Sequence, residues 1–281
     1  MTPISLDISI VTYKTDLLGL KIALISLCQA IERARERMSG QLLVSLFIVE
    51  NAPRHPTPAP SRLAASRYLR AFDAIHHVES PTNVGFGRGH NLAIFDARGA
   101  TADYHLVLNP DVELDPDALR LCIEYLEANP EAVAVVPNAV DGSNEPCYLA
   151  KAQPSVVVLA SRAYLPGIRL PWLRKRLERY ELRPAADRGE IIRDVPNGSG
   201  CFFFARARAL REVGGFAPQY FLYFEDFDLS NRLRRLGRMD YLPQVRLIHH
   251  GGNVGRKGLH HLAYFSRSAI RFFNRWGWRF C

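Results

Sequence analysis

The residues best suited to catalysis or ligand binding lie in a few short segments, and the first segment is Tyr104–Asp111. Its apolar run predicts a short buried strand that ends in Asn109-Pro110-Asp111. Open α/β sheets bind ligands beyond the carboxyl ends of their strands. A carboxylate placed there can hold a divalent cation beside a diphosphate. The alternative is that Asp111 only caps the helix expected to start near Asp115, because Asx turns are common.

A second segment places acids among aromatic side chains. Glu225, Asp226 and Asp228 fall within four residues, next to phenylalanine and tyrosine. Apolar surroundings raise the pKa of a carboxyl group toward the range that suits a general base. One acid in this position could simply favour the start of a helix, where the helix dipole stabilises negative charge. A helix start accounts for one acid but not for a cluster of acids among aromatic side chains, so we expect a functional role for Asp226.

Two further segments carry glycine and histidine at predicted strand ends. Gly85, Gly87 and Gly89 alternate between a predicted strand and a predicted helix, where glycine lets the backbone approach a ligand and a helix start attracts phosphate. A plain turn is the competing interpretation. His249 and His250 follow the strand 245–248 and precede two glycines. A histidine there can bind a metal or a phosphate, although a single histidine is more often structural.

Bulk properties restrict the protein class. The chain has 281 residues, 48% of them hydrophobic, which is enough for one large α/β domain or two small ones. No run of about 18 apolar residues predicts a membrane-spanning helix, and we expect no signal peptide, because Asp7 interrupts the first apolar run. The five scattered cysteines suit a reducing cytosol. The net charge of +8 favours an anionic partner: a nucleic acid, a membrane surface or a substrate.

The predicted elements alternate through the first 137 residues. Strands are expected at 6–12, 42–49, 75–78, 104–108 and 132–136, and helices at 17–38, 61–71, 88–98 and 115–127. This alternation predicts an α/β fold with a mostly parallel sheet and helices on both faces. Residues 141–193 are rich in proline and arginine without a clear period, so we interpret them as an insertion or specificity region. A strand at 194–205, helices at 206–213 and 226–236 and a strand at 245–249 follow.

The ordered set of motifs resembles the inverting family 2 glycosyltransferases, and within them the rhamnosyltransferase-type enzymes of bacterial O-antigen and cell-wall polysaccharide assembly. The resemblance covers roughly residues 5–275. It rests on these segments: Val11-Thr12-Tyr13, Glu50-Asn51, the glycine-rich stretch from Asn83 to Asn91, Leu108-Asn109-Pro110-Asp111, Gly214-Gly215-Phe216, Glu225-Asp226 with Asp228-Leu229, and His249-His250-Gly251-Gly252.

The resemblance implies a single GT-A domain over residues 1–281. Residues 1–137 would bind the nucleotide sugar, residues 138–255 would carry the acceptor and catalytic groups, and residues 256–281 would form a basic aromatic tail. Asp226 would be the catalytic base with Glu225 beside it, and Asp111 with His249 or His250 would hold Mg²⁺ or Mn²⁺. The substrate-binding residues implied are Thr12, Tyr13, Glu50, Asn51, Asn83, Gly85, Phe86, Gly87, Asn91, Asn109, Gly198, Gly200 and Gly215.

Departures from the family pattern bear on the metal and the product. Asn109-Pro110-Asp111 offers one carboxylate where the family's Asp-x-Asp offers two, and Glu50 replaces the usual Asp. Asn274-Arg275-Trp276 only partly matches the Gln-x-x-Arg-Trp motif of processive members, so we expect transfer of a single sugar. The resemblance implies dTDP-rhamnose as donor and a lipid-diphosphate-linked saccharide as acceptor.

Other functions stay open at this point. One is transfer from another nucleotide sugar; another is a nucleotidyltransferase, although its glycine-rich basic signature is missing after the first strand. A third is a non-catalytic protein that binds nucleotides or saccharides. We expect no nucleic-acid partner. The tail after residue 256 interleaves tryptophan with arginine. That composition suits either a helix packed on the domain or peripheral binding to the inner face of the cytoplasmic membrane.

Overall fold

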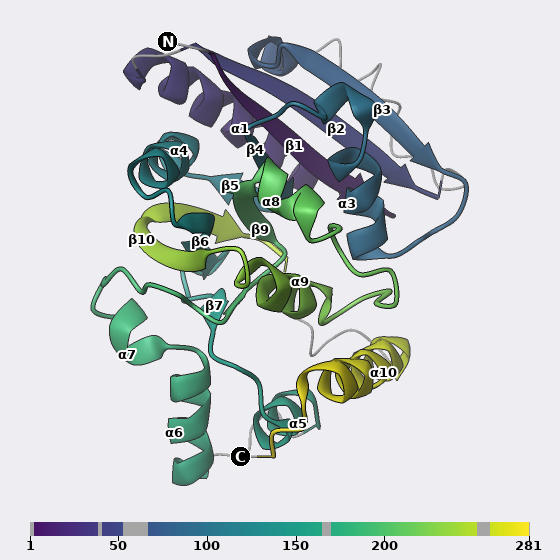
Figure 1. Cartoon of the computed structure of the whole chain (residues 1–281), viewed down its shortest axis with the longest axis vertical. Helices are drawn as coiled ribbons and strands as arrows, with labels where there is room; N and C mark the ends of the chain where they lie inside the picture. Colours follow the sequence, from purple (N-terminus) through teal and green to yellow (C-terminus); the bar gives the residue numbers. More distant parts are fainter. Residues whose placement is uncertain (1–2, 39–40, 53–66, 165–169, 252–258, 281) are drawn as a thin grey trace.

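A computed structural model describes residues 3–38, 41–52, 67–164, 170–251 and 259–280. Its centre is an eight-stranded sheet in the order β3-β2-β1-β4-β9-β6-β10-β5 (Figure 1). The strands are β1 (Ile4–Thr12), β2 (Leu42–Asn51), β3 (Ala74–Ser80), β4 (Tyr104–Leu108), β5 (Val112–Leu114), β6 (Ala132–Asp141), β9 (Phe202–Arg206) and β10 (Arg238–His249).

The sheet is mostly parallel, as the alternating pattern predicts. β3, β2, β1 and β4 run in parallel, and so do β6 and β10. The exceptions are β9, which lies antiparallel between β4 and β6, and β5, which pairs antiparallel with the edge of β10. β4 is completely buried, so both of its faces are covered by the rest of the protein.

Helices cover both faces of the sheet (Figure 1). One face carries α1 (Leu17–Arg37) and α4 (Ala118–Ala128), which contact each other. The other face carries α3 (Phe86–Ile94) and α8 (Ala207–Glu212). The short strands β7 (Ala150–Lys151) and β8 (Asn197–Gly198) form a separate two-stranded antiparallel sheet. Helix α9 (Glu225–Leu233) contacts this sheet through β8. Short 3-10 turns lie at η1 (Arg67–Ala71) and η2 (Ala97–Gly99).

A second, smaller apolar cluster holds the C-terminal helix in place. Helix α10 (Leu259–Trp276) lies with α5 (Val156–Tyr164) and α6 (Pro171–Tyr180) at the end of the molecule remote from β1–β3 (Figure 1). Phe272 and Phe273 of α10 are buried in this cluster beside Tyr220 and Phe224. The chain then returns to α5, where Val156 donates a backbone hydrogen bond to Arg279.

Several sequence expectations need correction. Within the described part of residues 141–193, the chain forms β7, α5, α6 and α7 (Arg183–Ala186), although the sequence shows no clear period there, and prolines stand in the first turns of α6 and α7. Proline suits a first helical turn because its missing N–H needs no partner there. The helix expected at 61–71 is a 3-10 turn over its described part, 67–71; residues 61–66 lie outside the described ranges.

The strand expected at 194–205 is also wrong in one respect, because it divides into β8 and β9. The Gly198 amide donates to Ser230 Oγ and the Gly200 amide to Asp226 Oδ2, so both glycines are bonded to side chains of α9. None of the helices within the described ranges combines the length and the hydropathy needed to cross a bilayer.

Candidate active site

The chain after β4 brings Asp111 next to His249. The Asn109 amide donates to the Cys201 carbonyl at 2.8 Å, which ties the end of β4 to the start of β9. Asp111 then accepts a backbone hydrogen bond from His250 at its carbonyl, and its carboxylate Oδ1 lies 3.4 Å from His249 Nε2. Only glycine fits at 251, because a Cβ there would stand 1.8 Å from Asp111 Oδ2. Gly251 therefore admits the carboxylate, as its position beside the histidines indicates.

The structure separates the two adjacent histidines. The ring of His250 lies 2.8 Å from Glu113 Oε2, so it is directed away from Asp111. His249 Nε2 is buried and has no hydrogen-bond partner among the described residues, although it faces Asp111 Oδ1. A buried imidazole nitrogen beside a carboxylate suits a divalent cation that accepts nitrogen and oxygen ligands. Just before α4 it is the Asp115 side chain that accepts from the Asp117 amide.

Asp226 lies in the first turn of α9, held by backbone amides. Its Oδ2 accepts from the Gly200 amide at 3.1 Å and its Oδ1 from the amide of Phe227 at 2.9 Å. Burial raises the pKa of Asp226 to about 6, and these N–H groups oppose that rise. The carboxylate is therefore ionised at neutral pH and basic enough to accept a proton from a hydroxyl.

Glu225 is a neutral neighbour of this carboxylate. It is buried, and its Oε2 has no hydrogen-bond partner among the described residues. Burial first, and then the negative charge of Asp226, raise the pKa of Glu225 well above its usual range. Two adjacent carboxyl groups with pKa values driven apart can hold different protonation states. Asp226 is the member of the pair that can act as a base.

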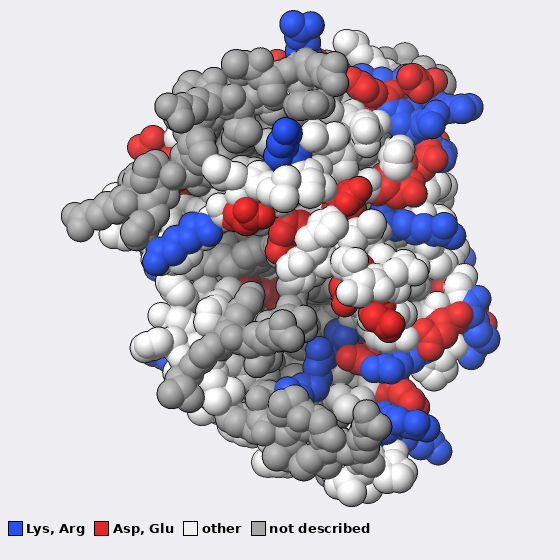
Figure 2. Space-filling model, turned by 180° about the vertical axis from the view of Figure 1, so that it is seen from behind, with Lys and Arg blue, Asp and Glu red and all other residues white. Residues whose placement is uncertain are grey.

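Asp111 and Asp226 approach each other around Cys201. The Cys201 backbone carbonyl accepts from Asn109, and the preceding Gly200 amide donates to Asp226. Burial raises the pKa of Cys201 to about 12, and the negative charges of Asp111 and Asp226 both add to that rise. Figure 2 shows a hollow at mid-height on the opposite face of the molecule from Figure 1, with acidic side chains along its upper edge and deeper inside.

The glycine-rich stretch is fixed by asparagine side chains. Asn51 accepts from the Val84 amide and donates to Asn83 Oδ1 and to the Gly85 carbonyl. Asn91 accepts from the Phe216 amide and donates to the Phe216 carbonyl, both at 2.8 Å. The asparagines therefore act on the conformation of the loop through these bonds.

Close contacts between the backbone and other parts of the chain occur at Gly85, Gly87 and Gly215. Gly85 has φ +90°, and a Cβ there would stand 2.2 Å from the Phe221 carbonyl oxygen. A Cβ at Gly87 would meet the Phe216 side chain at 2.6 Å, and one at Gly215 would meet Asn91 Oδ1 at 2.5 Å. The Phe86 amide donates to the same Phe221 carbonyl. The stretch is thereby joined to the segment that leads into α9.

At the other end of the sheet, Thr12 and Glu50 lie at the carboxyl ends of adjacent parallel strands. Thr12 is paired in register with Glu50, and Glu50 with Glu79. Thr12 is buried and donates to the Val49 carbonyl, whereas Tyr13 is 45% exposed. Parallel strands that end together place their side chains along one edge, where open α/β sheets bind ligands.

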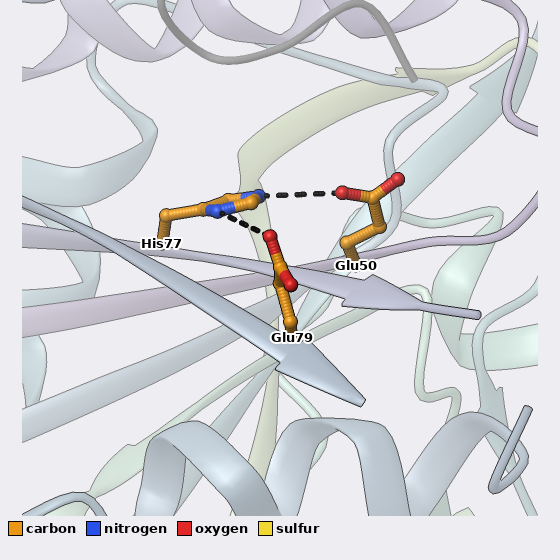
Figure 3. A group of neighbouring side chains, drawn as sticks. All are labelled: Glu50, His77 and Glu79. Carbon is orange, nitrogen blue, oxygen red and sulfur yellow. Dashed lines mark ion pairs between the residues drawn. The ribbon is translucent and has the colours of Figure 1, made fainter. Parts of the chain in front are cut away.

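His77 and Glu79 at this edge escaped sequence reasoning. Glu50 Oε2 lies 3.5 Å from His77 Nε2, and Glu79 Oε1 lies 3.6 Å from His77 Nδ1 (Figure 3). Within the described part of the chain, no other group of three or more His, Cys, Asp or Glu brings its ligand atoms within 4.8 Å of one another. Each ring nitrogen faces a different carboxylate, and the three side chains together could hold a metal ion. The alternating polar residues His77 and Glu79 on β3 were the available signal.

The fold defines a class before any relative is considered: an α/β protein with acids gathered beyond its strand ends. The sequence profile described as "Glycosyl transferase family 2" matches residues 26–214, and the chain belongs to this family. It is 28% identical over 242 residues to the N-acetylglucosaminyl-diphospho-decaprenol L-rhamnosyltransferase of Mycobacterium tuberculosis, covering 82% of this chain and 74% of that protein. It is 28% identical over 182 residues to rhamnosyltransferase WbbL of Escherichia coli, covering 61% and 63%.

Solved structures share the fold. GalNAc-T7, crystallised with UDP, GalNAc and Mn²⁺, superposes with a TM-score of 0.63 at 13% identity over 97% of this chain. The chain spans 48% of that protein's length. TarS residues 1–349 of S. aureus in complex with UDP gives 0.54 at 12% identity, covering 96% of this chain and 66% of that one. The expected fold, a GT-A glycosyltransferase, is confirmed.

Proposed function

We propose that this glycosyltransferase transfers one L-rhamnose from dTDP-rhamnose to a hydroxyl of a lipid-diphosphate-linked saccharide, with inversion at the anomeric carbon. The observation that carries the proposal is the Asp226 carboxylate, whose pKa is raised to about 6 beside Gly200 and Cys201. The similarity to rhamnosyltransferases supports the donor sugar, and the mycobacterial relative is named for a diphospho-decaprenol acceptor.

In the proposed reaction, Asp226 removes the proton of the acceptor hydroxyl while the hydroxyl oxygen attacks the anomeric carbon. The new C–O bond forms as the bond to the leaving diphosphate breaks, and the bonding electrons stay on the diphosphate. A carboxylate with a pKa near 6 contributes general-base catalysis of about 10²- to 10⁴-fold. Because Gly200 and Phe227 donate to its two oxygens, Asp226 is oriented before the substrate arrives.

The residues that would hold a divalent cation are Asp111 and His249. They fit such an ion because a buried ring nitrogen of His249 has no hydrogen bond from the described residues and faces the carboxylate at 3.4 Å. When bound, Mg²⁺ or Mn²⁺ would offset the charge that develops on the leaving diphosphate. The GT-A relative GalNAc-T7 was crystallised with Mn²⁺, which supports this assignment.

The donor nucleotide would lie along the edge formed by the ends of β1, β2 and β3. Tyr13 is exposed there for stacking, and Glu50 has one carboxylate oxygen, Oε1, that is buried without a hydrogen bond among the described residues. The fixed loop from Asn83 to Asn91 would close the donor site on the side of α9. The UDP complex of TarS supports a nucleotide-diphosphate donor.

Transfer assays test the proposal directly. The purified chain would be incubated with Mn²⁺, a prenyl-diphosphate-linked N-acetylglucosamine and a panel of nucleotide sugars that includes dTDP-rhamnose, UDP-GlcNAc and GDP-mannose. We expect a product one deoxyhexose heavier only with dTDP-rhamnose, with the anomeric configuration inverted by NMR. Transfer from another donor would reject rhamnose, and donor binding without transfer or hydrolysis would favour a non-catalytic binding protein.

We further propose peripheral docking on the inner face of the cytoplasmic membrane, within O-antigen or other cell-surface polysaccharide assembly. No Asp or Glu follows Asp240, whereas Arg267 and Arg271 recur along α10. Tyr264 and Ile270 are 40% and 52% exposed on the same helix, while Phe272 is buried. The outward side of α10 thus offers cations with exposed apolar groups, which suits an anionic lipid surface.

Deleting the tail would be a poor test, because α10 also supports the fold: Trp276 Nε1 donates to Asp228. The better variant is Arg267→Ser with Ile270→Ser. It should lose at least half of its co-sedimentation with phosphatidylglycerol vesicles at low salt, while its melting temperature stays the same. The matched control is Arg174→Ser on α6, whose side chain is 80% exposed. Equal sedimentation of all three proteins would reject the lipid role.

A further inference from the structure

A cluster of three cations surrounds one buried carboxylate near Asp226. Glu181 Oε1 lies 3.3 Å from Lys151 Nζ and 3.3 Å from an Arg162 nitrogen, and Arg183 contacts the other carboxylate oxygen at 2.5 Å. We call Lys151, Arg162, Tyr180, Glu181 and Arg183 the Glu181 cluster. Three positive charges face one negative charge, so the cluster carries an excess of two.

Neighbouring acids leave this excess largely uncompensated. Glu178 influences Arg183 from α6, but it is paired with Arg174 at 3.3 Å. Asp187 accepts the hydroxyl hydrogen bond of Tyr148, a ring that the Arg183 guanidinium covers at 4.8 Å. These acids lie at the exposed rim, where water screens their charge.

Part of the excess charge is held out of water. The Lys151 side chain is only 12% exposed and lies 5.5 Å above the ring of Tyr180. The Arg162 guanidinium lies 5.7 Å from the same ring and remains 43% exposed. Burial, followed by repulsion from Arg162, lowers the pKa of Lys151 to about 8. Burying like charges together costs free energy unless an anion joins them.

The Glu181 cluster adjoins the candidate base. Lys151 on β7 is in register with Asn197 on β8. The chain that leaves β8 leads to Gly200, whose amide donates to Asp226. The amide of Ala152 donates to the Tyr180 carbonyl at 2.8 Å, which fixes α6 against β7. The negative charge of Asp226 acts on the Tyr180 hydroxyl and adds to the rise in its pKa that burial causes.

We propose that Lys151, Arg162 and Arg183 bind the phosphate groups of the acceptor, with Glu181 holding them in place before the acceptor arrives. The inference rests on the proposed function, because a sugar that presents its hydroxyl to Asp226 carries its diphosphate on the same ring. Arginine forks bind phosphate oxygens in pairs, and a lysine adds a point charge. The donor's diphosphate has the same chemistry, so the test must separate the two sources.

Binding measurements make that separation without requiring turnover. Farnesyl diphosphate and dTDP would each be titrated by calorimetry into the wild-type chain, Arg162→Gln, Arg162→Lys and the control Arg174→Gln. We expect the Kd of farnesyl diphosphate to rise at least tenfold in Arg162→Gln, to recover partly in Arg162→Lys and to stay unchanged in Arg174→Gln. The Kd of dTDP should change by less than twofold in every variant.

Other outcomes would overturn the assignment. Equal losses of farnesyl diphosphate and dTDP affinity would move the cluster to the donor site. An unchanged farnesyl diphosphate affinity, or no binding by the wild-type chain, would make the cluster a structural ion-pair network. Neither titration depends on sugar transfer. A failure of the proposed rhamnosyl transfer would therefore be seen separately, in the transfer assay, as a chain that binds dTDP but forms no product. Melting curves of each variant would show that any loss is not caused by unfolding.

Discussion

The acids at the start of α9 fall into two regions that the protein treats in opposite ways. Asp226 faces the turn at Gly200 and accepts from two backbone amides, Glu225 beside it is buried, and neither acid has an ion pair with a cation among the described residues. Asp228, two residues further on, is fully buried and bonds to Arg232 at 2.8 Å and to Trp276 Nε1 at 2.9 Å, with Arg275 at 3.3 Å. A paired carboxylate serves packing, whereas one that lacks a cation is poised to exchange a proton.

This difference teaches that an acid run in a sequence can hold two functions. Asp228 joins α9 to α10 and, through Arg232, to the carbonyls of Val213 and Gly215. It therefore also fixes the turn that Asn91 clamps. Three tests can break or sharpen the contrast between Asp226 and Asp228, and a fourth examines the two histidines near Asp111.

The largest expected effect is on turnover. Asp226→Asn should lower the rate of transfer by about 10²-fold or more, because the amide cannot accept the proton. Its melting temperature at pH 8 should stay close to that of the wild-type chain, because the NH₂ group of Asn would face one of the two donating amides and offset the relief of a buried charge. A raised carboxyl pKa contributes stability that is present at low pH and lost as pH rises through about 6, and Asn removes that loss. Transfer rates near the wild-type value would reject the base.

Asp228→Asn should act on stability instead. Loss of the charge leaves Arg232 buried beside a neutral group, which costs about 3 kcal/mol of the free energy of unfolding. Urea denaturation measures this change, and Glu190→Gln in the exposed Arg188 pair should leave the free energy of unfolding nearly unchanged. If Asp228→Asn instead kept full stability and lost donor turnover, Asp228 would belong to the reaction and the contrast would fail.

The pH dependence of transfer probes the same contrast in the unmodified chain. Because Asp226 must be ionised to act and its pKa is raised to about 6, kcat should fall about tenfold per pH unit below 6 and be level above it. Circular dichroism at each pH checks that the fold persists. A rate that stays constant down to pH 4.5 would show that no buried carboxyl group limits the reaction.

The smallest expected effect separates the two histidines at Asp111. Asp111→Ala and His249→Gln should each raise the Mn²⁺ concentration for half-saturation by about tenfold, followed by electron paramagnetic resonance of the free ion. His250→Gln should leave it nearly unchanged, since that ring contacts Glu113. Full transfer activity in excess EDTA would exclude an essential metal, and a shift with His250→Gln alone would reverse the assignment of the histidines.

Much of the sheet was predictable, because apolar runs and strand ends report directly on burial. The pattern correctly indicates the positions of β1, β2, β4 and the start of β6. Asp111 follows the carboxyl end of β4, at the edge where open α/β sheets bind ligands. The direction of β9 was not predictable, because its continuous apolar run suits parallel and antiparallel pairing alike. The three-residue β5 escaped notice because Val112–Leu114 is too short for a period.

The site was predictable only where its residues belong to short sequence motifs. The pairing of Gly200 with Asp226 joins residues 26 positions apart, and nothing local announces it. The Glu181 cluster escaped for the same reason, since its members come from β7, α5 and the ends of α6 and α7. Asn91 appeared to be a ligand residue, yet its amide group binds the Phe216 backbone on both sides. Sequence shows that such a side chain is polar, but not which partner it meets.

The position of β9 between β4 and β6 has a consequence for synthesis on the ribosome. Residues 104–108 and 132–141 emerge long before residues 202–206, so the growing chain exposes one edge of β4 and both edges of β6. Unpaired apolar edges are sites of wrong association between nascent chains. Folding intermediates stalled before residue 202 should therefore depend on chaperones, and slow translation across residues 141–200 would lengthen that exposure.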